Sequence, residues 1–336
     1  MATIRDVAER AGVSVATVSA VLNQSCKVSE KLTARVLAAT RELNYRPNRL
    51  ARALSQKRTH LIGCLVPTIV NPFFPQVVKS VEDIAFENQF GIFVCNSEGN
   101  SGKVRYYQQM LLETQVDGVI IALSWELARP EVIQPFLEAG IPVVGLAGAR
   151  RSELIDCVVV DDVQGGFDAA NHLIELGHTR IGYIGAQNSE TTRLRLLGYK
   201  KALQAAGLPY DERDIMLGNS FSDAEGYTLA KMLLAREPEI SAIFSYNDIM
   251  GLGVMSALHD QGIAVPAQLS VIGFDDSAAS YSFPKMSTME IPKAEMGRIA
   301  ANVLINRIGG QAAAPRVFEL PPRLVVRDST GPLHHE

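Results

Sequence analysis

The fold is decided at the start of the chain, where residues 3–23 read TIRDVAERAGVSVATVSAVLN. Thr3 can cap a first helix, and Asp6, three residues on, can be its reciprocal partner near the positive end of the helix dipole. Gly12 suits the left-handed residue that ends this helix. Ser14 can then cap a second helix only two residues later. Two short helices joined by so tight a turn with a glycine are typical of a helix-turn-helix.

The apolar residues of these helices indicate how they pack. We expect three residues of the first helix to face three of the second: Val7, Ala8 and Ala11 against Val18, Val21 and Leu22. This packing assigns the following residues to the outer side and the N-terminal end of the second helix: Val15, Ala16, Thr17, Ser19 and Ala20. In a helix-turn-helix, such positions meet base edges and phosphates in the major groove.

A third amphipathic helix is predicted from Ser29 to Leu43. The residues that recur at helical spacing, and that can close the small core, are Leu32, Val36, Leu37, Ala39 and Leu43. Pro47 then sits where a helix begins. The segment from Pro47 to Ser55 is only about two turns long, and a helix that short is marginal alone in water. We therefore expect a hinge that orders only when something holds it.

The charge distribution separates this region from the rest. The 336 residues carry a net charge of −4, and the hydrophobic content of 47% is that of a globular protein. Residues 1–60 hold 11 Lys and Arg against 4 Asp and Glu, which leaves 21 against 32 for the remainder. A basic head on an acidic body fits a protein that presents one end to a polyanion, although a solvated helical face is the alternative. The arginines at 46, 49 and 52 favour phosphate contact.

From His60 onward, short apolar runs alternate with helical sequence. The predicted strands are 61–66, 91–95, 118–123, 141–146, 158–160, 181–184, 215–217, 240–245, 269–274, 317–320 and 324–327. This alternation is the βαβ signature of parallel sheets with helices on both faces, and two series of strands indicate two lobes. We expect an all-α head plus an α/β core of two doubly wound lobes, with ligands bound between the lobes at the carboxyl ends of the strands.

The segments 4–8 (IRDVA), 11–14 (AGVS), 17–19 (TVS) and 44–48 (NYRPN) resemble the DNA-binding head of the lactose/galactose/purine repressor family of bacterial transcription regulators. The resemblance runs through nearly the whole chain. It implies DNA contacts by Thr3, Ser14, Val15, Ala16, Thr17, Ser19, Ala20, Asn23, Tyr45, Asn48, Arg49, Arg52 and Leu54. In the family, a leucine at the place of Leu54 enters the minor groove and kinks the duplex. A packed leucine in a plain linker is the alternative.

The resemblance also implies a periplasmic-binding-protein-like core. Within it, the effector-binding residues would be Phe73, Phe74, Ser124, Arg193, Arg195, Phe221, Asn247 and Asp275. Aromatic rings suit the apolar face of a sugar, and carboxylate, amide and arginine groups suit its hydroxyl or acid groups. Alternatives stay open: Asn247 and Asp275 could cap the helices that follow, and both phenylalanines at 73 and 74 could be core. Arg195, placed on a first helical turn, would be unfavourable there without a ligand or partner.

Two departures from the family pattern affect specificity. Ala147 stands where members that bind neutral sugars often carry an aspartate, and Arg150 and Arg151 follow. The hypothesis is therefore an acidic effector, such as a sugar acid or a phosphorylated sugar. Ala20 replaces an arginine of several relatives, and small apolar residues favour thymine methyl groups over guanine. The family's central CpG step would receive the two Leu54 side chains.

The domains we expect are a DNA-binding head (1–46), a hinge helix and linker (47–59) and an effector-binding and dimerisation core (60–336). The lobes would comprise about 60–160 with 292–320, and 161–291 with 321–330. The interpretation is a cytoplasmic, ligand-responsive regulator, a repressor, that binds a pseudo-palindromic operator as a homodimer. Its partners would be operator DNA and a small-molecule effector, with no membrane, cofactor, metal or catalytic residue. Whether the effector induces or corepresses stays open.

Two other classes of protein would require motifs that the chain lacks. A dehydrogenase or kinase would need a phosphate loop, but the chain has no GxGxxG after a strand and no GxxxxGK[ST]. The nearest sequence, residues 251–256, lies in a helical pattern. An exported solute-binding protein would need a signal peptide, whereas residues 1–20 lack an apolar h-region and carry charges at positions 5, 6, 9 and 10. The four cysteines show no metal-like spacing and fit reduced thiols.

Overall fold

The computed structural model describes residues 2–23, 26–45, 58–124, 126–148 and 153–333. The chain divides into two compact units, Met1–Thr59 and His60–Glu336, which are described separately. Among the described residues, no helix is long and apolar enough to cross a membrane.

The small unit contains the three predicted helices: α1 (Ile4–Ala11), α2 (Val15–Asn23) and α3 (Glu30–Glu42). The capping box at the start of α1 is confirmed, because the Thr3 hydroxyl accepts from the Asp6 backbone N–H while the Asp6 carboxylate accepts from that of Thr3. Gly12 has φ 59°, the left-handed conformation expected at the end of α1. The Oγ of Ser14 accepts a 3.1 Å hydrogen bond from the Thr17 backbone, as expected of a cap for α2.

One prediction for the core of this unit was wrong. Val7, Val18 and Val36 are fully buried, but Leu37 is 39% exposed. Successive residues of a helix point about 100° apart. The burial of Val36 therefore turns the neighbouring Leu37 toward solvent, and Ala39 completes the buried face instead.

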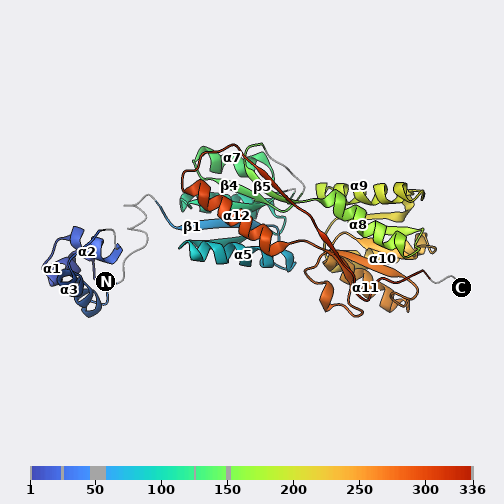
Figure 1. The fold of residues 1–336 in the computed structure, drawn as a ribbon, viewed down its shortest axis with the longest axis horizontal. Coiled ribbons are helices and arrows are strands. Elements are labelled where there is room, and N and C mark those ends of the chain that lie inside the picture. The colour runs from blue at the N-terminus through green and yellow to red at the C-terminus, as the bar shows by residue number, and fades with distance from the viewer. Residues whose placement is uncertain (1, 24–25, 46–57, 125, 149–152, 334–336) are drawn as a thin grey trace. The chain divides into compact units, whose positions relative to one another are not determined.

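The large unit has two six-stranded sheets, and helices cover both faces of each (Figure 1). The sheet of the first lobe runs β11-β5-β4-β3-β1-β2. Its strands are β1 (Leu61–Val66), β2 (Gly91–Asn96), β3 (Gly118–Ala122), β4 (Val143–Leu146), β5 (Asp156–Val160) and β11 (Val317–Leu320). Its helices are α5 (Phe73–Glu87), α6 (Ser101–Glu113), α7 (Pro130–Glu138) and α12 (Lys293–Ile308).

The sheet of the second lobe runs β12-β10-β9-β8-β6-β7. Its strands are β6 (Ile181–Ala186), β7 (Ile215–Gly218), β8 (Ala242–Ser245), β9 (Ser270–Asp275), β10 (Ser287–Glu290) and β12 (Arg323–Val325). Its helices are α8 (Asp162–Glu175), α9 (Glu190–Ala205), α10 (Asp223–Arg236) and α11 (Asp248–Asp260), with the 3₁₀ turns η1 (Glu212–Asp214) and η2 (Ala279–Tyr281). Every described strand pair is parallel except β10 with β12.

The chain passes between the lobes after β5, after β10 and after β11. In Figure 1 the last of these passages is the red segment that runs from one sheet to the other. The inner strands β3, β5, β6 and β9 are buried along their whole length, as expected for parallel strands covered on both faces. The carboxyl ends of the strands of the second lobe therefore present their following residues at one edge.

Sequence reasoning missed β10. Its residues begin with Ser287 and Thr288, which are polar yet fully buried. Their side chains are satisfied by distant partners: Ser287 pairs with Thr330, and the Thr288 hydroxyl donates to Asp248 at 2.6 Å. A strand of this kind lacks the apolar run on which the sequence search relied.

Candidate functional site

The N-terminal end of α2 is the exposed part of the small unit that the helix-turn-helix interpretation requires. Val15 is 41% exposed, and Ala16 is also exposed, although both are apolar. Ser14 is exposed, Thr17 is half-buried, and their hydroxyl groups lie 2.9 Å apart. Small apolar side chains next to hydroxyl groups can contact thymine methyl groups and phosphate oxygens.

Two arginines brace the turn that presents this end. Arg35 of α3 donates to the carbonyl oxygen of Ala11 at 2.5 Å, directly before the left-handed Gly12. Arg10 of α1 pairs with Glu42 of α3 at 2.6 Å. The third helix therefore holds α1 and the start of the turn that leads into α2.

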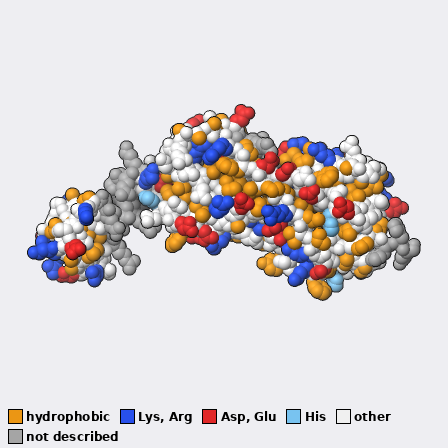
Figure 2. All heavy atoms as spheres, in the orientation of Figure 1, with side chains coloured by type: hydrophobic (Ala, Val, Ile, Leu, Met, Phe, Trp, Pro, Cys, Tyr) orange, Lys and Arg blue, Asp and Glu red, His pale blue; other side chains and the backbone are white. Residues whose placement is uncertain are grey.

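The other predicted DNA-binding residues fall into three groups. Thr3 is engaged in its capping box, Ser19 and Ala20 are half-buried on α2, and Tyr45 packs beside the small core. Asn23 ends α2. Asn48, Arg49, Arg52 and Leu54, together with the predicted hinge helix, lie outside the described residues. On the face seen in Figure 2, Lys and Arg side chains lie at several places over the surface of the small unit.

A buried arginine is the centre of the second candidate site. Arg195 lies in the second turn of α9, not in its first as the sequence analysis had assumed, and is only 4% exposed. Its Nε donates to Oδ1 of Asp162 at 2.8 Å, and its Nη1 donates to the Tyr246 carbonyl oxygen at 2.5 Å. Its Nη2 lies 4.0 Å from Oδ1 of Asp275. The site thus joins residues that follow β5 and β8 to the last residue of β9.

Close packing of α8 against α9 brings Arg195 to Asp162. A Cβ atom on Gly198 of α9 would lie 2.1 Å from the carbonyl oxygen of Val163, and one on Gly166 of α8 would lie 2.2 Å from that of Arg195. Only glycine permits backbones to approach so closely. The two glycines therefore fix the helix separation at which the ion pair forms.

The aromatic rings around Arg195 form a stack. The guanidinium carbon lies 3.5 Å from the ring centroid of Phe274 and 4.7 Å from that of Tyr246. The Tyr246 ring in turn lies 4.7 Å from that of Phe221, which is 36% exposed. Cation–π contacts of this kind hold a guanidinium in place. The outermost ring leaves an aromatic face at the surface, and such a face suits the apolar side of a sugar ring.

Asp275 has an unusual backbone and an unusual environment. Its φ is 106°, which side-chain-bearing residues rarely adopt, and its side chain is buried. Burial raises the pKa of Asp275 to about 8, with the positive charge of Arg195 opposing the rise. Its carbonyl oxygen accepts a 2.6 Å hydrogen bond from Nζ of Lys293 at the second passage between the lobes. Strained backbone of this kind is often found at ligand-binding positions.

Asn247 and Asp248 both have structural partners. The Asn247 side chain caps α11 by accepting from the Met250 backbone N–H at 2.9 Å, which is the alternative that its sequence position had left open. The Asp248 carboxylate accepts from the backbone N–H groups of Ser277, Ala278 and Ala279. This carboxylate therefore shapes the loop that follows Asp275.

The same loop contacts the first lobe. The Gln76 side chain of α5 donates to the Ser277 carbonyl oxygen at 3.4 Å, and the Ser277 hydroxyl group lies 3.5 Å from Oδ1 of Asn71. Residues 71–76, which include the predicted Phe73 and Phe74, are thus brought to the loop after β9. Phe73 is buried in the core, however, and its ring packs edge-on against that of Phe74.

The remaining predicted residues are placed differently. Ser124 follows β3, and its buried hydroxyl group has no hydrogen-bond partner among the described residues. Arg193 does not join the cluster: its side chain is exposed and pairs with Glu190 of its own helix. Ala147 is buried with φ 51°, and Arg150 and Arg151 lie outside the described residues. Tyr246 was missed, although its place between β8 and Asn247 was a usable signal.

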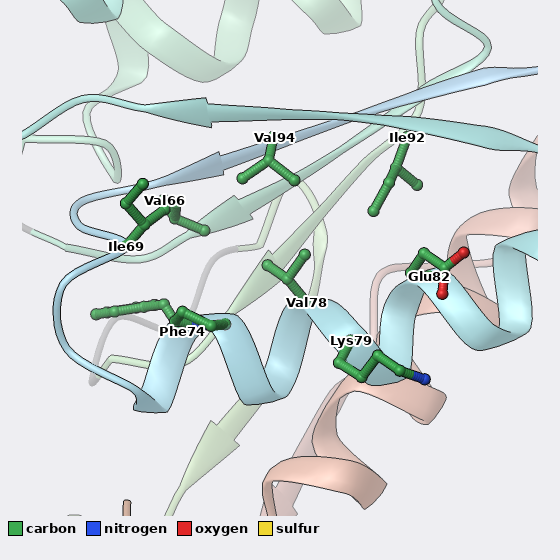
Figure 3. A pocket seen from close by; sticks show the side chains of 9 residues that line it. Val66, Ile69, Phe74, Val78, Lys79, Glu82, Ile92 and Val94 are labelled. Atoms are coloured by element: carbon green, nitrogen blue, oxygen red, sulfur yellow. The ribbon is translucent and has the colours of Figure 1, made fainter. Parts of the chain in front are cut away.

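An apolar groove of about 390 Å³ lies beside α5 (Figure 3), and none of the residues that line it belongs to the Arg195 cluster. It is lined by Val66, Ile69, Phe74, Pro75, Val78, Lys79, Glu82, Ile92 and Val94. Phe74 therefore faces this groove, and β2, which supplies Ile92 and Val94, is the edge strand of its sheet. Ile69, Val70 and Val94 are 52%, 83% and 45% exposed. So much exposed apolar surface in one place is typical of an interaction face.

Comparison with known proteins agrees with both halves of this description. Residues 3–48 match the family described as bacterial regulatory proteins, lacI family, and residues 170–330 match a periplasmic binding protein-like domain. The chain is 36% identical to the HTH-type transcriptional repressor PurR of Photobacterium profundum, over 99% of this chain and 100% of the relative. It belongs to the lacI family.

Further lacI-family proteins match along their whole length. The ribose operon repressor of Escherichia coli is 37% identical over 98% of this chain and all of the relative. Among solved structures, the lac repressor dimer bound to operator and the anti-inducer ONPF is 29% identical with a TM-score of 0.85, and covers 98% of this chain and 99% of its own. A transcriptional regulator CelR–cellobiose complex has a TM-score of 0.74 at 32% identity, over 98% and 100%. These relatives are transcription regulators.

Proposed function

We propose that this lacI-family protein is a ligand-responsive transcription regulator, a repressor, that binds a pseudo-palindromic operator as a homodimer. A small-molecule effector at the Arg195 cluster sets the operator affinity. The observation that carries the proposal is that one chain combines an exposed, braced recognition-helix end with a buried polar cluster at the carboxyl ends of parallel strands. The relatives named above are repressors or regulators over their whole length.

The functional division of the chain follows from this proposal. Residues 1–46 read DNA, residues 47–59 form the hinge helix and linker, and residues 60–336 bind effector and the second copy. The protein acts in the bacterial cytoplasm and is not an enzyme. Two observations support the last point: the Gly251–Gly253 segment lies inside α11, and the Asp248 carboxylate is occupied by the backbone N–H groups of the following loop.

The second copy occupies the apolar groove. The groove lies beside an edge strand, and its apolar side chains would remain in water in a monomer. Tyr281 and Phe283 of the second lobe, which are 78% and 99% exposed, extend the apolar surface that a partner can cover. A symmetric dimer also places two heads on the two half-sites of a pseudo-palindrome.

The effector is a neutral polyhydroxylated molecule. Arg195 is neutralised by Asp162 at 2.8 Å, and Asp275 stands on its other side, so the cluster carries no net positive charge for an acid. The 4.0 Å gap between Nη2 of Arg195 and Oδ1 of Asp275 suits a hydroxyl group, which accepts from one and donates to the other. This charge balance weighs against the acidic effector inferred from Ala147.

Selection from a random DNA pool with the purified chain tests the proposed function. The expected result is enrichment of one pseudo-palindrome with a central CpG step. Enrichment of no sequence above background would contradict the proposal. Calorimetry then tests the effector class by comparing the affinities of neutral sugars (ribose, glucose and cellobiose) with those of sugar acids (gluconate and glucuronate). Tighter binding of the acids would overturn the neutral class without touching the DNA result.

A further inference from the structure

The chain enters the large unit at His60, and three contacts fix this residue. Its backbone N–H donates to Oδ2 of Asp117 at 2.7 Å. Its carbonyl oxygen accepts from the Gly91 N–H at 2.8 Å, and its ring lies 5.4 Å from that of Phe90. Both hydrogen-bonding groups of its backbone are therefore bound to the sheet of the first lobe.

The backbone of His60 is also strained. Its φ is 54°, in the left-handed region that costs a side-chain-bearing residue energy. A conformation of this kind persists only where the surroundings over-determine it. The entry to a domain usually frays instead. The contacts at His60 thus fix the direction in which the chain enters the lobe.

Asp117 is well placed to impose this direction. It follows the buried Val116 and directly precedes β3, and its own backbone N–H donates to the Leu61 carbonyl oxygen at 2.9 Å. Its carboxylate therefore stands on the rigid starts of β1 and β3. A hydrogen bond from a backbone N–H to a carboxylate is roughly twice as strong as one between neutral groups.

We propose that Asp117 is a positioning residue: through His60 it fixes the direction in which the connecting chain leaves the core, and operator affinity depends on it. This inference rests on the proposed function. Two heads must meet two half-sites at a set spacing. If the backbone of residue 60 is free to move in the unbound protein, operator binding must fix it at a cost in conformational entropy. The entropy cost of fixing one residue corresponds to a loss of about tenfold in operator affinity. Non-specific binding, which depends on phosphate charge, does not need that spacing.

The test compares Asp117→Ala and Asp117→Asn with Glu131→Gln in the full-length protein. Glu131 is an exposed carboxylate of the same lobe, in the first turn of α7. The probes are the palindrome selected by the wild-type chain and a duplex of shuffled sequence. We expect Asp117→Ala to lose about tenfold or more for the palindrome and nothing for the shuffled duplex. Asp117→Asn, which keeps an acceptor oxygen, falls in between, and Glu131→Gln matches the wild type.

Three outcomes would overturn the inference. The first is wild-type palindrome affinity in folded Asp117→Ala. If Asp117→Ala does not unfold cooperatively, the test rests on Asp117→Asn, and the second outcome is wild-type palindrome affinity in that variant. The third is an equal loss for both duplexes, which would mean that the head itself is damaged. Failure of the wild-type chain to select any palindrome is a different result, since it overturns the proposed function and with it this inference.

Discussion

Nε of Arg195 donates a 2.8 Å hydrogen bond to Oδ1 of Asp162, and the two side chains are 5% and 2% exposed. Asp162 is the first residue of α8, two residues after the end of β5 of the first lobe, and Arg195 belongs to α9 of the second lobe. The buried charge at the candidate effector site is therefore neutralised at a passage between the lobes. A change in this pair acts on stability and on the site together.

Replacement of Asp162 by Ala leaves the guanidinium of Arg195 buried without its nearest carboxylate. Breaking a buried pair from one side costs about 3–5 kcal/mol. We therefore expect the free energy of unfolding to fall by about that amount in urea titrations. Glu190→Ala removes the exposed partner of Arg193 and is the matched control, with a loss below about 1 kcal/mol. Equal losses for the two variants would contradict the assignment of Arg195 as a buried, paired charge.

The pH dependence of the free energy of unfolding, compared between Asp275→Asn and the wild type, tests whether the Asp275 carboxylate is buried. Burial raises the pKa of Asp275 from 3.8 to about 8, so the folded state keeps a proton that the unfolded state has released. The contribution of Asp275 to the free energy of unfolding therefore declines as pH rises from about 4 to about 8. The variant should gain stability over the wild type across this range. A difference between variant and wild type that does not change with pH would show that Asp275 titrates normally.

His178 should make the protein sensitive to acid. Its Nδ1 lies 2.9 Å from the Ser241 hydroxyl group, and its Nε2 lies 3.0 Å from that of Ser270. Burial lowers the pKa of His178 below 6.5, so the unfolded state takes up a proton first. Stability that is fully present above pH 6.5 is then lost as pH falls through the lowered pKa. His178→Gln should flatten this decline in unfolding titrations between neutral and acid pH, whereas His259→Gln, at an exposed position, should not.

Val94→Glu tests the dimer face. Val94 lines the groove from the edge strand β2, and a carboxylate there must be desolvated when a second copy covers it. We expect analytical ultracentrifugation to show a dimer for the wild type and a monomer for the variant, with operator affinity lowered at least about tenfold because each head then binds alone. Met232→Glu on α10 is the control, since Met232 is 54% exposed elsewhere. A dimer in both variants would place the interface on another surface.

The sequence was sufficient to predict those elements whose structure depends on residues close together along the chain. Thr3, Asp6 and Gly12 predicted both ends of α1, because caps depend on contacts within a few residues. The alternation of apolar runs predicted most strands of both sheets for the same reason. The polar strand β10 escaped, since Ser287 is satisfied by Thr330, 43 residues further along the chain.

The candidate site was predictable in its residue types but not in its pairings. Arg195 was identified, yet its burial depends on Asp162, which lies 33 residues away, and on the close approach of α8 to α9. Tyr246 was missed although it lies between β8 and Asn247, because its stack with Arg195 and Phe221 joins residues that are far apart along the chain. Arg193 was predicted to bind the effector together with Arg195, but its side chain pairs with Glu190 of the same helix.

Reciprocal linkage between operator and effector tests the central claim most directly. The wild-type protein is titrated with the selected palindrome at increasing concentrations of each neutral sugar, and the sugar that responds is then titrated with and without the palindrome. The account predicts that one sugar changes palindrome affinity, and that the palindrome changes the affinity for that sugar by the same factor. Arg195→Lys should remove both effects together. Tight sugar binding that leaves palindrome affinity unchanged would contradict the account.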